Sequence, residues 1–244
     1  ALSDFGDRQL LGLVQDEPEA VMSTLSEVIG LLQNIARVDC VLPDYSEAML
    51  RSEMDLFPTW YLTRLLGLTL TDEFWRLWQG LCDRLVASAL AEPQVFVHRD
   101  FHSRNIMVPS KGALGLLDFQ DAVRGPLSYD LVSLLRDCYV EYEPAMQQAL
   151  VEGYRQIWLS DPRVQAMTPT AFYKSFENMG LQRHLKCAGI FSRLCLRDGK
   201  SRYLNDIPMV LKYIASVCKR QPELGEFYRW LQVFVLSDPL GRSA

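Results

Sequence analysis

The sequence lacks the cysteine pattern of a disulfide-stabilised protein. Its six cysteines form no C-x-x-C pair and stand at positions 40, 82, 138, 187, 195 and 218. A disulfide framework is typical of much shorter secreted chains. Cys82, Cys138 and Cys218 fall inside apolar helical patterns, where buried free thiols are common. The cysteines therefore predict a reducing compartment, which we take to be the cytoplasm.

Two further absences exclude broad classes of partner. No uncharged apolar run approaches the roughly 18 residues needed to cross a bilayer, and the N-terminus lacks a signal-peptide pattern. The net charge is −5, and the 25 basic residues are scattered along the chain. Binding to nucleic acid requires clustered Lys and Arg to neutralise phosphates. We therefore expect neither a membrane nor a nucleic acid as a partner.

Most of the sequence has the apolar periodicity of α-helices. With 244 residues, 49% of them hydrophobic, the chain can bury a large core. No linker or repeat divides it, so we expect a single domain over residues 1–244. In residues 71–92 the apolar positions recur with the helical period, which predicts Trp75 and Trp78 in the core. Further helical patterns cover residues 18–38, 46–66, 127–139, 144–159, 169–195, 206–219 and 223–236.

One region near the middle of the chain breaks this helical rhythm. Short apolar runs at 95–97, 106–108 and 114–119 are separated by polar loops, and the turn sequence PSKG lies between the second and third. This pattern predicts a small β-hairpin. The expected fold class is mainly α (α+β), a helical body that carries a β-hairpin.

The polar stretch VHRDFHSRN (97–105) lies among these short runs. His98-Arg99-Asp100 is followed by Asn105, and Asp118-Phe119 follows the hairpin. The catalytic loop of protein kinases is written H-R-D-x-x-x-x-N, with a D-F dipeptide after a hairpin. Phosphoryl transfer needs a carboxylate near the acceptor hydroxyl, and oxygen ligands for Mg²⁺.

The second histidine completes the pattern H-x-D-x-H-x-x-N (98–105). This pattern resembles the aminoglycoside and choline phosphotransferase-like kinases, which have a protein-kinase-like fold. The continuation LLDFQDAVRGPLSYDLVSLL (116–135) is similar to the same family. The resemblance covers residues 95–136 and implies an ATP-dependent, Mg²⁺-dependent kinase that acts on a small molecule. It also implies that the helical body corresponds to the C-lobe of that fold.

The resemblance assigns expected roles to individual residues. Asp100 is expected to be the catalytic base, and Asn105 and Asp118 are expected to bind Mg²⁺. Support of the loop is expected from His98, His102 and Asp130. The segment Ser3–Arg8 resembles the passage between the two lobes, which implies nucleotide contacts from Asp4 and Phe5. Expected substrate contacts, by analogy alone, come from Glu53, Asp55 and Asp121.

One segment points to a particular substrate. EMDLFPTWY (53–61) resembles a segment of the bacterial anomeric kinases that phosphorylate N-acetylmuramate and N-acetylglucosamine in cell-wall recycling. The resemblance therefore implies the anomeric hydroxyl of an N-acetyl amino sugar as the acceptor. Aminoglycoside, choline and homoserine stay open as alternatives within the family.

The sequence shows no sign of the lobe that binds the phosphates of ATP in this family. It has no G-x-G-x-x-G or Walker A pattern, and its first lysine is Lys111. We expect the chain to correspond to the C-lobe alone, starting near the interlobe hinge, and to be inactive by itself. One alternative is that the chain is a non-catalytic interaction module and not an enzyme. Another is that His98, Asp100 and His102 form a transition-metal site in place of a kinase catalytic loop.

Overall fold

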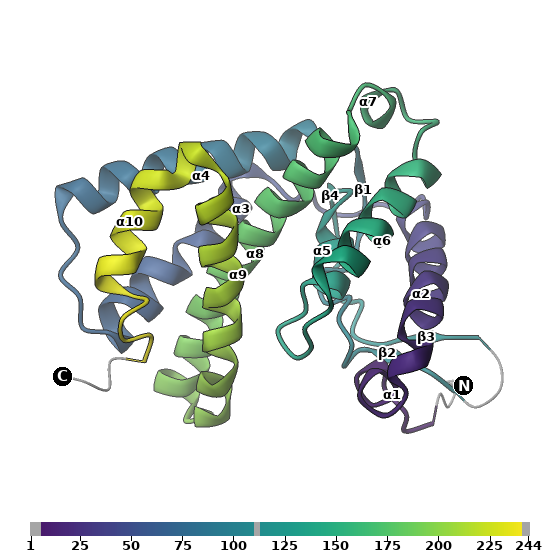
Figure 1. Cartoon of the computed structure of the whole chain (residues 1–244), viewed down its shortest axis with the longest axis horizontal. Helices are drawn as coiled ribbons and strands as arrows, with labels where there is room; N and C mark the ends of the chain where they lie inside the picture. The colour runs from purple at the N-terminus through teal and green to yellow at the C-terminus, as the bar shows by residue number, and fades with distance from the viewer. Residues whose placement is uncertain (1–5, 110–112, 241–244) are drawn as a thin grey trace. The chain divides into compact units, whose positions relative to one another are not determined.

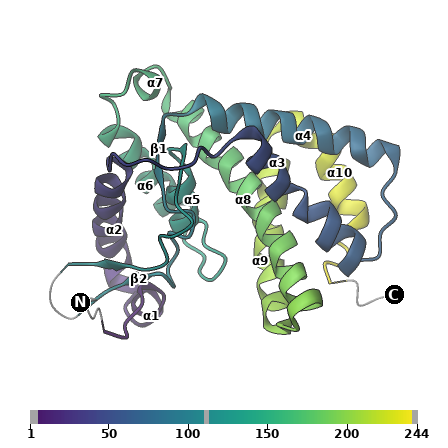
Figure 2. The ribbon, with the colours of Figure 1, turned by 180° about the vertical axis from the view of Figure 1, so that it is seen from behind.

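The computed structural model describes residues 6–109 and 113–240. The chain forms two compact units: residues 1–45 with 90–176, and residues 46–89 with 177–244. Figure 1 labels the helices and strands of both units, and Figure 2 shows the same ribbon from behind. No helix among the described residues has the length and apolar character that a membrane span requires.

The first unit is built mainly of helices. Its amphipathic helix α2 (Val21–Ala36) buries an apolar stripe that includes Leu25, Val28 and Leu32, and it packs against α6 and β1. The other helices of this unit are α1 (Leu10–Asp16), η1 (Pro18–Ala20), α5 (Tyr129–Leu135), α6 (Pro144–Ile157) and α7 (Pro162–Gln165).

Two small antiparallel sheets position the loops of the first unit. Strand β1 (Gln94–Val97) pairs with β4 (Val123–Pro126), with Val97 opposite Val123. Strand β2 (Ile106–Met107) pairs with β3 (Gly115–Leu116) and forms the predicted hairpin. The loop 98–105 therefore runs from one sheet to the other, and residues 117–122 run back.

The second unit is entirely helical in its described part. It contains α3 (Glu47–Met54), the π-helix η2 (Phe57–Leu65), α4 (Asp72–Ala91), η3 (Ser201–Asp206), α9 (Ile207–Arg220), η4 (Pro222–Leu224) and α10 (Gly225–Phe234). The long helix α8 (Pro169–Asp198) belongs to this unit from residue 177 onward. Aromatic contacts join its helices, among them Phe57 of η2 with Trp78 of α4 and Phe74 of α4 with Trp230 of α10.

The predicted fold class is correct, and the predicted helices are present with three local differences. The expected helix 46–66 is broken after Met54, because Pro58 lacks the N–H that would continue the first segment. Strand β4 was not expected from its sequence VRGP. Trp75, predicted in the core, is 45% exposed, whereas Trp78 is buried. The predicted free thiols Cys82, Cys138 and Cys218 are buried and free. The single-domain organisation of residues 1–244 stays a prediction.

Candidate active site

The carboxylate of Asp130 holds the start of the loop 98–105. Its Oδ2 accepts the backbone N–H of His98 at 2.6 Å, and its Oδ1 accepts that of Arg99 at 3.0 Å. Asp130 lies in the first turn of α5 and is 2% exposed. Hydrogen bonds from two consecutive amides to one buried carboxylate fix the path of the chain just before Asp100. These are the contacts that the predicted loop support requires.

His98 contributes to the same arrangement from inside the unit. Its side chain is fully buried, and its Nδ1 accepts the backbone N–H of Asp100 at 3.3 Å. Burial lowers the pKa of His98, against the opposite effect of the Asp100 carboxylate, the Leu117 carbonyl and the Asp118 carboxylate. The ring is thus favoured in its neutral form, in which Nδ1 can act as an acceptor. Its position fits a bracing role better than a chemical one.

Two hydrogen bonds bring the three motif residues of the catalytic pattern together. The amide Nδ2 of Asn105 donates to the carbonyl of Asp100 at 3.1 Å. The backbone N–H of Leu117 donates to the carbonyl of Asn105 at 3.0 Å. Because Asp118 directly follows Leu117, the second bond places it beside the end of the loop that begins at Asp100.

The backbone is strained at two positions of this region. Arg99 has φ of 75° and Asp118 has φ of 61°, and they are the only non-glycine residues with positive φ in the described ranges 6–109 and 113–240. This left-handed conformation costs free energy in residues other than glycine, although Asp and Asn tolerate it best. Strain of this kind often occurs at functional sites. Here it falls beside the predicted base and at a predicted metal ligand.

The C-terminal half of the loop is held by a residue that the sequence did not indicate. Asp137 is fully buried, and its carboxylate accepts the backbone N–H groups of Ser103 at 2.9 Å and Tyr139 at 3.1 Å. Tyr139 in turn lies under the guanidinium of Arg104, 3.5 Å from the ring centroid, and against the edge of His102. No local sequence pattern pointed to Asp137, which lies two residues beyond the end of α5. The ring contact of His102 fits a role in loop support.

Asp121 lies in the exposed loop after Asp118. Its carbonyl oxygen is within 3.4 Å of the guanidinium of Arg99, which also faces the ring of Tyr45. The contact involves the backbone of Asp121. Among the described residues, no hydrogen bond fixes the direction of its carboxylate. Its predicted contact with substrate stays a prediction.

The other two predicted substrate residues lie in the second unit. Glu53 is buried, and its carboxylate forms an ion pair with Lys186 at 3.0 Å and accepts a hydrogen bond from Gln182 at 3.4 Å. Asp55 accepts the indole N–H of Trp78 at 3.1 Å. Both carboxylates therefore have structural contacts within their own unit, and their roles toward a substrate stay predictions. Asp4 and Phe5, predicted at the nucleotide hinge, lie outside the described residues.

The rival reading of the loop as a transition-metal site finds no support in the geometry. Among the described residues, no three His, Cys, Asp or Glu side chains gather as metal ligands. His98 is buried and uses Nδ1 inside the loop. The assignment of Asn105 and Asp118 as oxygen ligands of Mg²⁺ stays a prediction.

More than half of the sequence matches a family model. Residues 3–166 match the model described as "Phosphotransferase enzyme family". The chain belongs to the phosphotransferase enzyme family. This membership confirms the resemblance that the catalytic pattern implied.

Curated relatives carry a more specific name. The chain is 42% identical over 234 residues to the N-acetylmuramate/N-acetylglucosamine kinase of Pseudomonas putida, covering 92% of the chain and 66% of that protein. It is also 42% identical to the kinase of the same name from Neisseria meningitidis, covering 98% of the chain and 72% of that protein. The chain thus spans about two-thirds of the length of the Pseudomonas putida relative.

Solved structures of phosphotransferases share the fold at low sequence identity. An ethanolamine kinase from Plasmodium vivax matches with a TM-score of 0.62 and 10% identity, over 92% of this chain and 64% of the other. A choline kinase from Cryptosporidium parvum matches with a TM-score of 0.57 and 13% identity, over 95% and 73%. These matches confirm the kinase-like, mainly α fold.

Proposed function

We propose that this chain is the catalytic part of an ATP-dependent small-molecule kinase. The acceptor that the relatives favour is the anomeric hydroxyl of N-acetylmuramate or N-acetylglucosamine, because proteins 42% identical to this chain bear those names. The sequence segment 53–61 resembles a segment of the same kinases and gives the same indication. Aminoglycosides, choline and homoserine are the alternative acceptors within the family.

The proposal rests on side-chain oxygen atoms that stay available where the loop 98–105 meets residues 117 and 118. In the described part of the chain, the carboxylates of Asp100 and Asp118 and the amide oxygen of Asn105 accept no hydrogen bond from the protein. Their backbones, in contrast, are fixed by Asp130, His98 and each other. A rigid backbone that presents unused acceptor oxygens is suited to bind ligands from outside the chain.

These oxygen atoms fit a magnesium ion. Mg²⁺ prefers hard oxygen ligands and keeps several of its waters, and Asn105 and Asp118 supply one amide and one carboxylate group. We assign them to hold Mg²⁺. When bound, the ion would neutralise charge on the phosphates of ATP.

The carboxylate of Asp100 would accept the proton of the acceptor hydroxyl. The hydroxyl oxygen forms a bond to the γ-phosphorus, the bond from that phosphorus to the β,γ-bridging oxygen breaks, and ADP leaves. Since the transition state is loose, the contribution of the chain is mostly position and charge. The strained start of the loop, held by Asp130, fixes the position of Asp100.

Because this chain alone is expected to be inactive, the test is phosphoryl transfer by a purified two-lobed protein that contains this chain together with an ATP-binding N-lobe, with ATP, Mg²⁺ and a panel of acceptors. The panel comprises N-acetylmuramate, N-acetylglucosamine, an aminoglycoside, choline and homoserine, with ADP release as the readout. The methyl glycoside of N-acetylglucosamine is the matched control, because its anomeric hydroxyl is blocked. We expect turnover with the two free sugars and none with the glycoside.

Other outcomes distinguish the alternatives. Turnover of the methyl glycoside would rule out the anomeric hydroxyl as the acceptor. A preference for choline or an aminoglycoside would move the substrate within the family. Absence of transfer to every acceptor would favour a non-catalytic module. We also place the reaction in the cytoplasm, since the six cysteines are free and the reaction consumes ATP.

A further inference from the structure

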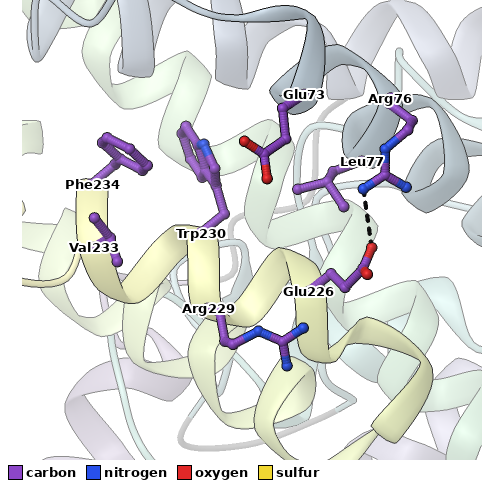
Figure 3. A pocket seen from close by; sticks show the side chains of 8 residues that line it. All are labelled: Glu73, Arg76, Leu77, Glu226, Arg229, Trp230, Val233 and Phe234. Atoms are coloured by element: carbon purple, nitrogen blue, oxygen red, sulfur yellow. Dashed lines mark hydrogen bonds and ion pairs between the residues drawn. The ribbon is translucent and has the colours of Figure 1, made fainter.

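A groove in the second unit lies between helices α4 and α10 (Figure 3). It encloses a cavity of about 260 Å³. Three lining residues come from α4 and five from α10: Glu73, Arg76, Leu77, Glu226, Arg229, Trp230, Val233 and Phe234. None of these side chains has a part in the proposed phosphoryl transfer, so the groove needs a separate explanation.

The two walls of the groove carry the same four-residue pattern. Residues 73–76 read Glu-Phe-Trp-Arg, and residues 226–229 read Glu-Phe-Tyr-Arg. The phenylalanine of each pattern is buried, so the acid and the base, three residues apart, lie together on the exposed side of each helix. Each wall therefore presents one negative and one positive group.

The helices run in opposite directions along the groove. Arg76 pairs with Glu226 at 3.1 Å, whereas Arg84, two turns further along α4, pairs with Glu223 at 3.8 Å. In this orientation Glu73 and Arg229 also face the groove from opposite walls. Within the described residues neither makes a hydrogen bond or an ion pair. Figure 3 shows the Arg76–Glu226 ion pair, with Glu73 and Arg229 on opposite walls and no interaction drawn between them.

One end of the groove is apolar. Val233 is 66% exposed and Phe234 is 50% exposed, and both lie beside Trp230 at the end away from the Arg76–Glu226 pair (Figure 3). Exposed apolar side chains that gather at one place and are bordered by charges are typical of protein interaction sites.

We propose that this groove binds the same groove of a second copy of the chain, and we call the surface of its eight lining residues the α4/α10 face. A two-fold axis that runs along the groove, between the two helices, exchanges the α4 wall with the α10 wall. Glu73 of each copy then faces Arg229 of the other. Arg76 likewise faces Glu226 of the other copy.

The same axis brings the apolar ends together. Trp230, Val233 and Phe234 line the groove along which the axis runs. Each therefore contacts its own counterpart in the second copy. A two-fold contact must be self-complementary, with every interaction made twice. The equal number of acids and bases on the α4/α10 face and their order along the two helices meet that requirement.

The size of the face predicts a weak dimer. Its eight residues are fewer than the roughly 20–30 residues per partner of a standard stable interface. We therefore expect a dissociation constant of about 1–100 µM, and weaker binding at high salt because the charged groups are exposed. The test is sedimentation velocity of the purified protein over a range of concentrations that brackets these values.

Four variants test the face directly. Val233→Asp and Phe234→Asp are expected to weaken the dimer at least tenfold, because each buries a charge at the apolar end. Met22→Asp is the matched control, since Met22 is 42% exposed in the first unit, and it should leave the equilibrium unchanged. Glu73→Arg alone and Arg229→Glu alone should each weaken the dimer by like-charge repulsion.

The double variant Glu73→Arg/Arg229→Glu decides the geometry. It restores opposite charges across the two-fold axis, so we expect its dissociation constant to return to within about threefold of the wild type. A monomer at every concentration tested would overturn the proposal. A dimer unaffected by Val233→Asp and Phe234→Asp would do so as well, and so would a double variant as weak as the single ones.

Discussion

The backbone N–H of Leu117 donates a hydrogen bond to the carbonyl of Asn105 at 3.0 Å. This bond joins the residue that follows β3, the second strand of the hairpin, to the end of the loop 98–105. Asp118, the next residue, is therefore placed beside Asn105 by the backbone and does not depend on contacts of its own side chain. The carboxylate stays available for a ligand, and the following predictions depend on that arrangement.

In the two-lobed protein, replacement of Asp100 by Asn is expected to reduce turnover by about 10²–10⁴-fold, because the amide cannot accept the proton of the acceptor hydroxyl. The side chain carries no described hydrogen bond, so the unfolding temperature should stay near the wild-type value. Affinity for a non-hydrolysable ATP analogue, measured by calorimetry, should also be retained. Asp39→Asn, at an exposed position of the first unit with no assigned role, is the control and should keep most of the activity. A fully active Asp100→Asn protein would refute the assigned base.

Asp118 has two separable properties, its charge and its left-handed backbone. Asn tolerates the same backbone conformation but lacks the charge, whereas Ala lacks both advantages. We expect Asp118→Asn to unfold at nearly the wild-type urea concentration but to need much more Mg²⁺ for half-maximal activity. Asp118→Ala should show the same Mg²⁺ defect and lose roughly 1 kcal/mol of stability as well. Equal stability of the two variants would contradict the strain argument.

Glu92 is a buried carboxyl group between the end of α4 and the start of β1. It is 2% exposed, and it accepts the backbone N–H and the hydroxyl of Ser128, both at 2.8 Å. Burial raises the pKa of Glu92 from 4.5 to about 7, and the two hydrogen bonds oppose this rise. The folded state therefore binds a proton more tightly than the unfolded state does.

The stability from this proton is fully present below about pH 4.5 and is lost as the pH rises through about 7. Gln at this position stays neutral and can still accept from the Ser128 N–H and donate to its hydroxyl. We expect Glu92→Gln and wild type to be about equally stable at pH 4.5. At pH 8 the variant should be more stable, by up to about 3 kcal/mol. Urea unfolding at both pH values measures this, and a gap independent of pH would disprove the assignment.

The sequence predicted those parts of the site that follow a fixed local spacing. Asp100, Asn105 and Asp118 were found because the distances between them along the chain are set by one loop and one hairpin. Asp137 was missed, because its partner Ser103 lies 34 residues away and no local rule connects them.

The unexpected features of the fold have similar causes. Strand β4 contains Gly125 and Pro126, which disfavour strands, and its conformation comes from pairing with β1. The helical period placed Trp75 on the apolar stripe of α4, but the buried side is formed by Phe74, Trp78 and apolar residues further along the helix. Tertiary contacts decided both outcomes, and a single sequence does not display them.

Gly189 allows helix α8 to approach the chain at Leu56 closely. A Cβ atom at position 189 would overlap the backbone of Leu56, which cannot move as a side-chain end can. We expect Gly189→Ala to lose about 1–3 kcal/mol of stability, despite the better helix propensity of Ala. Gly80→Ala in α4 is the matched control, because a Cβ there meets no atom within 4 Å, and it should gain up to about 1 kcal/mol. Urea unfolding of both variants measures the difference, and a Gly189→Ala protein as stable as Gly80→Ala would show that the close approach is not required.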